Sequence, residues 1–420
     1  MGDAHLEHIC WRKIFNVFVP QADSIGAVAV IRSLGDHGYT VYAASCNPLA
    51  LGLKSNYVKS SIICPDYDQD YLTWLRQCIK KNDIDVIIPS EGFLLAIKDH
   101  YQEFAHLLPI SSSEETVYQC LCKVDVFQSF LDSGDSSLRD HIPETLIVSD
   151  PGEVNWDELQ SWPMPLFIKG DGFYARDVDE ARIIKAESID EARSAVAEIA
   201  RDYRKILIQS CSDGVKATVN LLFQNGHLLA ESMVLATHES PHTGGLTALR
   251  HSWWHEPMYE DAVNRLKHLD WNGPVMVEYK WDAKTGSFSF IELNSRYWAA
   301  LHVDLLAGIH FPVIHLDYFF QKCNKDLPKQ RLTGKIRVRN ALPPDFGYVA
   351  SSLKDRGISI SRKASILAEF FLLFFHPGIK ADLLYPGDRK LYFINLWHFI
   401  KHVTRSLWNR SRGPQQSDGM

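Results

Sequence analysis

The segment FSFIELNSRYWAAL, residues 288–301, constrains the fold of this chain more than any other stretch. It begins like a half-buried β-strand, in which every second side chain faces the same side of a sheet. The side chains on one face would be those of Phe288, Phe290, Glu292, Asn294 and Arg296. A carboxylate, an amide and a guanidinium on a face that starts with two phenylalanines need a physical reason.

A second strand before this segment predicts how the two strands pair. PVMVEYKWDAKTGSFSFIELN reads as a β-hairpin with a three-residue loop at 284–286, whose last residue is a glycine that can take the left-handed conformation. Ala283 would then pair with Ser287, which places Glu278 directly opposite Glu292. Two carboxylates are therefore expected to face each other.

Carboxylates on directly opposed strand residues, with Cβ atoms about 4.5–5.5 Å apart, repel each other. A shared proton, a neighbouring cation of the protein or a bound metal would offset this repulsion. Asn294 adds an amide oxygen to Glu278 and Glu292, and three hard oxygen donors without His or Cys favour magnesium over zinc. Magnesium held in this way completes its shell with water and phosphate oxygens, so a nucleotide is implied. The alternative is that Lys280 or Arg296 bridges the two acids on the protein surface.

Composition and charge limit the classes of protein to which the chain can belong. Its 420 residues predict two or three domains, and 46% hydrophobic with 23% charged residues is typical of a soluble globular protein. A net charge of -7 provides no basic field, so we expect no nucleic-acid partner. The eight cysteines are scattered and no secretion signal is visible, which favours reduced thiols and a cytoplasmic location.

Two apolar stretches lie near the end of the sequence. The run ASILAEFFLLFF, 364–375, is shorter than the roughly 20 residues that span a bilayer and contains Glu369, so we expect a core helix and no transmembrane segment. The aromatic and basic stretch at 391–412 could form an amphipathic helix. We expect it to pack on the protein rather than dock on a membrane surface.

Residues 14–110 alternate between strand-like and helix-like stretches. KIFNVFVP and YTVYAAS read as strands, with the helix SIGAVAVIRSLGDHG between them. This order predicts a parallel sheet with ligands beyond the carboxyl ends of its strands. Gly26 and Glu91 each follow such a strand, although both could belong to ordinary connections. The first turn lacks the GxGxxG spacing of a dinucleotide site, so a nicotinamide-dependent oxidoreductase is disfavoured.

Strands dominate from residue 163 onward. Asn225 and Gly226 form a strong hairpin signal between ATVNLLF and HLLAESMV. Upstream, Lys123 falls in a helical stretch, and Lys169 ends an apolar β-run that leads into a loop with two glycines. An ammonium delivered to such a loop can neutralise phosphate charge.

Together these elements resemble the ATP-grasp superfamily, in its carboxylate-amine ligase-like branch. The resemblance covers about residues 14–320 and rests on motifs in the family's order: CLCKVDVFQSF, PLFIKGD, ILIQSCSDG, VMVEYKWD and FIELNSRYW. It implies an α/β and α+β chain, in which a pre-ATP-grasp, Rossmann-like N-terminal domain precedes a two-subdomain ATP-grasp fold and a C-terminal extension. The implied boundaries are 14–110 for the first domain, 111–325 for the ATP-grasp domain with a lid at roughly 145–212 and a core at roughly 213–325, and 326–420 for the extension.

The resemblance also implies which residues bind the nucleotide. Lys123 and Lys169 would contact the phosphates of ATP, with Lys169 nearest the transferable end. The hinge between the two halves of the fold would bind adenine, through the backbone around Gln209, Ser210, Cys211 and Ser212.

Metal and substrate contacts follow from the same resemblance. Glu278, Glu292 and Asn294 would bind two magnesium ions, or manganese in their place. Arg296 would hold a substrate carboxylate or the transferring phosphoryl group, and Arg250 would reach a substrate anion. Catalysis would then depend on Lys169, Arg250 and Arg296. We expect the two substrates to meet in the cleft between the N-terminal domain and the core, near Gly26, Glu91, Arg250 and Arg296.

The implied activity is ATP-dependent ligation of a small carboxylate or amino acid to an amine, through an acyl phosphate, with release of ADP. Two alternatives stay open: a kinase-like ATP-grasp enzyme that activates a non-carboxylate oxygen, and a nucleotide-binding regulatory module without turnover. Ser210 and Lys216 stand where relatives often carry acids, which together with a glycine-poor phosphate loop is the only support for such a module. The extension could cover the core, form a homodimer or dock on a partner.

Overall fold

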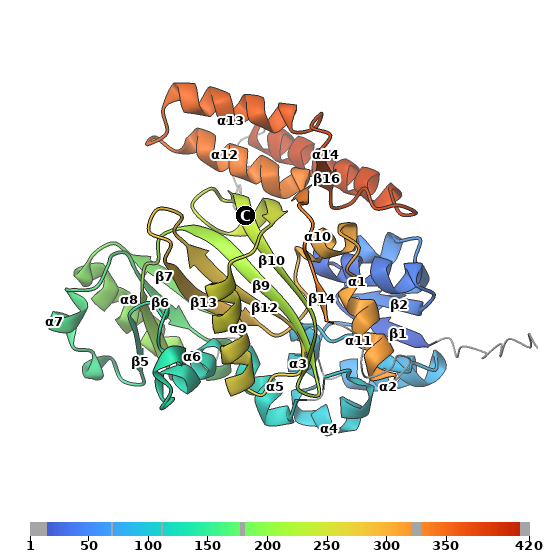
Figure 1. Cartoon of the computed structure of the whole chain (residues 1–420), viewed down its shortest axis with the longest axis horizontal. Coiled ribbons are helices and arrows are strands. Elements are labelled where there is room, and N and C mark those ends of the chain that lie inside the picture. Colours follow the sequence, from blue (N-terminus) through green and yellow to red (C-terminus); the bar gives the residue numbers. More distant parts are fainter. Residues whose placement is uncertain (1–14, 69, 111, 177–180, 321–328, 412–420) are drawn as a thin grey trace, which may run out of the picture. The chain divides into compact units, whose positions relative to one another are not determined.

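The computed structural model describes residues 15–68, 70–110, 112–176, 181–320 and 329–411. The chain forms two compact units, divided after Pro109. The first unit contains a four-stranded parallel sheet, and the second contains a four-stranded antiparallel sheet and an eight-stranded sheet (Figure 1).

Strands and helices alternate in the first unit, which confirms the predicted parallel sheet. The strand order is β3-β2-β1-β4. Ser24 caps the first helix by accepting a hydrogen bond from the Ala27 N–H (3.0 Å), and Gly38 follows its end with a φ of +84°. The finer assignment to a Rossmann-like domain stays a prediction. The elements are β1 (Asn16–Val19), α1 (Ile25–Asp36), β2 (Thr40–Ser45), β3 (Val58–Ile63), α2 (Tyr71–Lys81), β4 (Val86–Ile87), α3 (Glu91–Ala96) and α4 (Tyr101–Phe104).

The smaller sheet of the second unit has the order β5-β8-β6-β7, with every pair antiparallel. Helix α8 covers this sheet because Ala192, Val196 and Ile199 recur on one side of it and pack on Ile168 and Ile208. The elements up to this point of the second unit are α5 (Glu114–Leu121), α6 (Lys123–Leu131), β5 (Thr145–Val148), α7 (Trp156–Leu159), β6 (Leu166–Gly170), β7 (Arg182–Ala186), α8 (Ile189–Asp202) and β8 (Ile206–Ser210).

The large sheet has the order β13-β12-β9-β10-β11-β15-β16, and β14 pairs with β10. The hairpin signal between β9 and β10 is confirmed, since Asn225 and Gly226 have φ values of 50° and 75° between the paired residues Gln224 and His227. Three strands of this sheet, β14 to β16, come from beyond residue 325. The remaining elements are β9 (Val215–Gln224), β10 (His227–Ser240), β11 (Leu246–Ser252), α9 (Glu256–His268), β12 (Gly273–Trp281), β13 (Phe288–Asn294), α10 (Leu301–Leu306), α11 (Phe311–Phe319), β14 (Gln330–Arg331), β15 (Arg337–Arg339), α12 (Phe346–Lys354), α13 (Ile360–Leu372), β16 (Ile379–Ala381) and α14 (Lys390–Ser411).

The loop between β12 and β13 is one residue longer than predicted. The expected pairing of Ala283 with Ser287 is wrong, because the Asp282 N–H donates to the Ser287 carbonyl oxygen (2.9 Å). Four residues therefore connect the strands, and the Gly286 N–H closes the loop on the Asp282 carbonyl oxygen (2.8 Å). Gly286 does take the left-handed conformation, with a φ of 73°.

A β-bulge on β13 compensates for the longer loop. Between the pairs Tyr279–Phe290 and Glu278–Glu292, strand β13 contains the extra residue Ile291. The additional residue in the strand cancels the additional residue in the loop. Glu278 therefore lies directly opposite Glu292, as the sequence predicts, although by a different route.

The apolar run at 364–375 is not a core helix, contrary to the prediction. Helix α13 buries Ile366 and Phe370, which cluster with Val349 of α12. The other side of the same helix leaves Phe371 and Leu372 more than half exposed. The covered side packs on α12 and on Arg339 of β15, whose guanidinium lies over the Phe370 ring. In the described part of the chain, no helix combines the length and the apolar character needed to cross a membrane.

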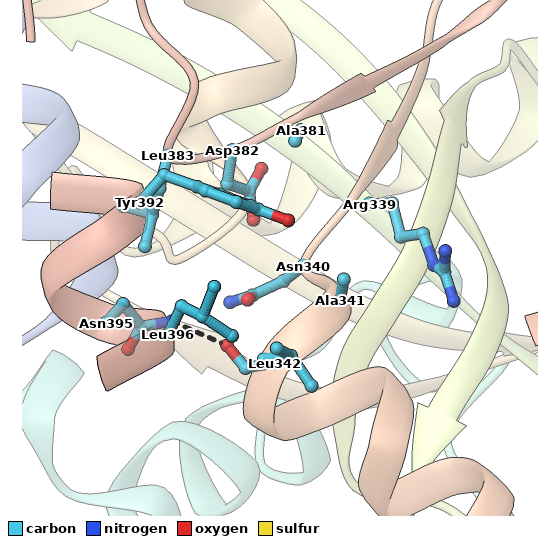
Figure 2. A pocket seen from close by; sticks show the side chains of 10 residues that line it. All are labelled: Arg339, Asn340, Ala341, Leu342, Ala381, Asp382, Leu383, Tyr392, Asn395 and Leu396. Atoms are coloured by element: carbon cyan, nitrogen blue, oxygen red, sulfur yellow. Dashed lines mark hydrogen bonds between the residues drawn. The ribbon is translucent and has the colours of Figure 1, made fainter. Parts of the chain in front are cut away.

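A buried ion pair joins the residues beyond 325 to the large sheet. Arg250 on β11 pairs with Asp382, directly after β16 (2.6 Å), and both side chains are almost fully buried. Asp382 also helps to line a small cavity of about 10 Å³. Such a volume holds about one water molecule. At this cavity the Asn395 Nδ2 of α14 donates to the Leu342 carbonyl oxygen (2.7 Å; Figure 2). These contacts attach the C-terminal helices to the sheet.

We expect Arg250→Met to lower the free energy of unfolding by about 3–5 kcal/mol, because the Asp382 carboxylate would be left buried without its cation. The double variant Arg250→Met/Asp382→Leu should lose much less, since neither charge remains. Urea unfolding of the full chain measures both changes. Arg182→Met is the matched control, because Arg182 pairs with Glu198 on the surface. A single variant no less stable than this control would contradict the assignment.

Candidate active site

The β-bulge separates the acidic side chains of β13 from its phenylalanines. Cross-strand partners share a face, so Phe290 lies with Tyr279 on one face and Glu292 lies with Glu278 on the other. The prediction that Glu292 shares a face with the phenylalanines is wrong for this reason. The phenylalanine face packs on α6, where the rings of Phe290 and Phe130 are 5.5 Å apart. The acidic face is thereby available for a site.

A continuous chain of polar contacts joins four of the predicted site residues. The Lys123 ammonium, at the start of α6, pairs with Glu292. Asn294 donates from Nδ2 to the Glu292 Oε1 (3.1 Å), and Arg296 donates from Nη2 to the Asn294 Oδ1 (3.1 Å). The Asp171 carboxylate accepts a hydrogen bond from the Lys123 backbone N–H (2.8 Å), which fixes the start of α6. Sequence reasoning missed Asp171, although it directly follows the predicted strand that carries a lysine.

The two facing glutamates differ in their affinity for a proton. Burial raises the pKa of Glu278, although the Lys216 ammonium lies 2.8 Å from its carboxylate and opposes this change. Burial acts in the same direction on Glu292, but the Lys123 ammonium outweighs it and lowers the pKa of Glu292 to about 2. Glu292 therefore stays ionised at neutral pH, and a proton taken up by the pair would go to Glu278.

The cations that pair with these acids are not the ones considered from the sequence. Lys280 lies nearest Glu239 (3.6 Å). Lys216 pairs with Glu278 and also donates to the Gly245 carbonyl oxygen (2.9 Å). Lys123 pairs with Glu292. Lys216 stood out in the sequence only as a departure from the family pattern. Its pairing depends on the register of β9 against β12, and no single-strand pattern reveals that register.

Lys169 is a desolvated cation close to this chain of contacts. It lies on β6 and donates to the Gln209 Oε1 (2.7 Å). Burial of the ammonium, with a smaller contribution from the charge of Lys123, lowers the pKa of Lys169 to about 8, although Glu292 opposes the change. A phosphate group beside this ammonium would favour its protonated form. Lys169 is therefore suited to bind a polyanion.

A cavity of about 300 Å³ contains part of the acidic face. Its polar and charged lining includes Lys216, Glu292, Asn294 and Arg296. The rest of the lining is small or apolar and consists of Thr218, Val234, Ala236, Gly245, Leu246, Thr247, Met276, Ala299 and Ala300. Three predicted site residues therefore border a volume in the range of small-molecule sites, which runs from about 300 to 1,000 Å³.

The predicted adenine segment connects β8 of the smaller sheet to β9 of the large sheet. Gln209 and Ser210 end β8 and are buried, whereas Cys211 and Ser212 begin the connection to β9 and are half-buried. The Gln209 side chain is occupied by Lys169 and by the Thr145 hydroxyl group, to which it donates (3.0 Å). The contact with adenine stays a prediction.

Three further predicted substrate contacts lie elsewhere in the chain. Arg250 is almost fully buried beside Asp382 and is not among the residues that line the cavity. Gly26 is buried in α1, and Glu91 is the exposed first residue of α3, both in the first unit. Their contacts with a substrate stay predictions.

The donor set of the acidic face fits magnesium by its chemistry. Glu278 and Glu292 face each other and each attracts an ammonium group, so this face favours a cation. Asn294 adds an amide group beside them: its Nδ2 donates to Glu292, and its Oδ1 accepts a hydrogen bond from Arg296. Within the described ranges, no group of three or more His, Cys, Asp and Glu residues could hold a metal ion. A metal here would therefore rely on the amide, water and phosphate oxygens as well as the two carboxylates.

The pKa of Lys169 predicts how nucleotide affinity depends on pH. Below pH 8 the ammonium is charged and binds phosphate, whereas above pH 8 binding must first take up a proton. The affinity for a non-hydrolysable ATP analogue should therefore fall by about tenfold for each pH unit above 8, as titration calorimetry can measure. Lys169→Arg should remove this dependence, because a guanidinium stays charged. Lys185→Arg, at an exposed lysine of β7, is the control and should leave it intact; a flat profile for the unmodified chain would contradict the prediction.

Comparison with known proteins identifies the fold. No family model matches the sequence, and no curated protein matches it. Among solved structures, N5-carboxyaminoimidazole synthetase from Staphylococcus aureus matches over 87% of this chain and 87% of its own, with 12% identity and a TM-score of 0.61. Biotin carboxylase from Campylobacter jejuni matches over 77% and 75%, with 15% identity and a TM-score of 0.59.

L-amino acid ligase from Bacillus licheniformis matches over 73% of this chain and 74% of its own, with 13% identity and a TM-score of 0.52. These proteins are ATP-grasp carboxylate-amine ligases. Sequence identities this low show the fold and no more. The chain shares the fold of these proteins, the ATP-grasp fold that its sequence motifs predicted.

Proposed function

We propose that this chain is an ATP-dependent carboxylate-amine ligase that joins a small carboxylate or amino acid to an amine. The observation that carries the proposal is the chain of contacts from Lys123 through Glu292 and Asn294 to Arg296. It joins a cation to a carboxylate, an amide and a guanidinium, and the last three line a cavity of small-molecule size. The fold shared with carboxylate-amine ligases supports the same activity.

The reaction follows from the chemistry of its substrates. A carboxylate is a poor electrophile, so its oxygen first attacks the γ-phosphorus of ATP, the bond from that phosphorus to the β,γ-bridging oxygen breaks, and ADP leaves. The amine nitrogen then attacks the acyl carbon of the resulting acyl phosphate. The carbon–oxygen bond to phosphate breaks, inorganic phosphate leaves and the nitrogen loses a proton. The product is an amide or peptide bond.

The side chains of this site position the reactants and neutralise their charge. Lys169 and Lys123 balance the negative charge of the phosphates. Arg296 lines the cavity, and its planar guanidinium suits a carboxylate or a phosphoryl group. No residue of the chain needs to form a covalent bond with the substrate, because orientation and charge stabilisation account for catalysis of this kind.

Glu278, Glu292 and Asn294 would hold magnesium, or manganese in its place. The metal would supply charge stabilisation on the phosphate oxygens. The position of Glu292 between Lys123 and Asn294 keeps its carboxylate ionised and oriented for this role. Glu278 would contribute the second carboxylate. Without a metal, the Lys216 ammonium balances the charge of this carboxylate.

Glu292→Gln should lower magnesium-dependent ATP turnover by more than about 100-fold, because the carboxylate that stays ionised would become neutral. Nucleotide-induced thermal stabilisation should also lose its dependence on magnesium. Glu198→Gln removes an exposed carboxylate from α8 and provides the control. Turnover close to that of this control would exclude Glu292 from the metal site.

Arg296→Ala should reduce ligation by about 100-fold while thermal unfolding changes little, because its guanidinium faces a cavity and is only partly buried. Product formation and the unfolding temperature are measured on the same preparation. Arg201→Ala, on the exposed side of α8, is the matched control. Normal turnover of the Arg296 variant would remove this residue from the site.

A substrate screen tests the activity itself. The purified chain is incubated with ATP, magnesium, and pairs of amino acids or small carboxylates and amines, and ADP release is measured together with the mass of any product. Condensed product with stoichiometric ADP supports the ligase. A phosphorylated product without an amide selects the kinase-like alternative. Nucleotide binding without ADP release from any pair selects the regulatory module.

A further inference from the structure

The helices beyond residue 345 expose an unusual amount of apolar surface. Twelve of the twenty large apolar side chains that are exposed in the described part of the chain lie between residues 346 and 400. Every exposed Phe or Trp of the described residues is among them. Scattered apolar residues need no explanation, but a concentration of this kind marks an interaction surface.

The exposed residues of α13 lie on the side of the helix that has no partner. Ile360, Leu367 and Phe371 follow at intervals of seven and four residues, which places them on one helix face. Phe375, three residues beyond the helix, is 84% exposed. The opposite face packs on α12, and α12 in turn contacts β10. Helix α13 is therefore the outer layer at this end of the second unit (Figure 1).

Helix α14 has a second stripe of the same kind. Phe393, Trp397 and Ile400 recur at intervals of four and three residues and are 61%, 56% and 44% exposed. The Lys401 ammonium lies over the Trp397 ring, 5.1 Å from its centroid. Aromatic and basic groups are thus interleaved on one exposed face.

Positive charge surrounds these apolar stripes. Residues 346–405 contain nine Lys and Arg against four Asp and Glu, whereas the whole chain has a net charge of -7. Two of the four acids, Asp382 and Asp388, are buried, and the other two are only partly exposed. The exposed cations are Lys354, Arg356, Arg362, Lys380, Arg389, Lys390, Lys401 and Arg405. The region is therefore a cationic surface on an anionic protein.

We infer that α13 and α14 dock this protein on the surface of a membrane that contains anionic lipids. Aromatic and aliphatic side chains enter the boundary between headgroups and acyl chains, while Lys and Arg bind the anionic headgroups, as in interfacial helices. This inference departs from the sequence-based prediction that the 391–412 stretch packs on the protein rather than docks on a membrane surface: among the described side chains, Leu391 is buried, whereas the exposed stripe of Phe393, Trp397 and Ile400 binds lipid.

A second copy of this chain fits the surface less well. A symmetric dimer would bring the same cationic groups of both copies face to face, and like charges there repel. Lys is also depleted in the cores of protein interfaces, whereas basic residues beside exposed aromatics suit a lipid headgroup layer. Charge therefore favours the membrane surface.

Vesicle flotation of the full chain tests the inference. Unmodified protein should float with vesicles of equimolar phosphatidylcholine and phosphatidylglycerol and stay in solution with vesicles of phosphatidylcholine alone. Added salt should weaken the binding, because the attraction to the headgroups is electrostatic. The inference would be overturned if the protein did not bind the anionic vesicles. Equal binding to both kinds of vesicle at every salt concentration would also overturn it.

Matched variants locate the contact. Arg389→Gln/Lys390→Gln should weaken vesicle binding by about fivefold for each charge removed, whereas Lys80→Gln/Lys81→Gln at the end of α2 should not. Phe371→Ser/Phe375→Ser should weaken it by at least about tenfold. The apolar control is Leu49→Ser/Ile63→Ser, at side chains that are 61% and 54% exposed in the first unit.

Analytical ultracentrifugation of the same proteins separates the membrane from a second copy. A monomeric chain whose flotation is lost in the α13 and α14 variants, with unchanged thermal unfolding, supports the inference. A dimer that dissociates in Phe371→Ser/Phe375→Ser, without vesicle binding by the unmodified chain, assigns the surface to self-association and overturns it.

Discussion

The repulsion between Glu278 and Glu292 is the constraint on which the rest of the site depends. Two carboxylates on paired residues of a partly buried sheet cannot both be ionised without cations beside them. The second unit supplies ammonium groups from separate segments: Lys123 from α6 and Lys216 from β9. In such a site a bound metal ion could replace an ammonium group as the cation that balances the carboxylates. Binding of a metal–nucleotide complex would require this exchange.

The bulge at Ile291 allows one short strand to serve the core and the site at once. Phe288 and Phe290 pack in the interior, whereas Glu292 and Asn294 face the cavity, within seven residues of sequence. A regular strand would have turned the acids into the apolar interior, at a large cost in desolvation. Bulges commonly redirect side chains beside active sites, and this one performs that function.

The residues beyond 325 have two physical roles. Strands β15 and β16 extend the large sheet, and the buried pair of Arg250 with Asp382 fixes them there. Helices α13 and α14 each bury one side against the rest of the second unit. Their other side is exposed and carries apolar and cationic side chains.

The sequence by itself determined the parallel sheet of the first unit, the turn at Asn225 and the fold, because these depend on local periodicity, turn chemistry and motif order. It also predicted that Glu278 faces Glu292, although through a loop that is one residue too short. Only the tertiary structure decided which cations face the acids, how the bulge divides the two faces of β13, and which side of α13 is covered. Those features depend on register and contacts between segments far apart in the chain, and a one-residue shift reverses every side chain of a strand.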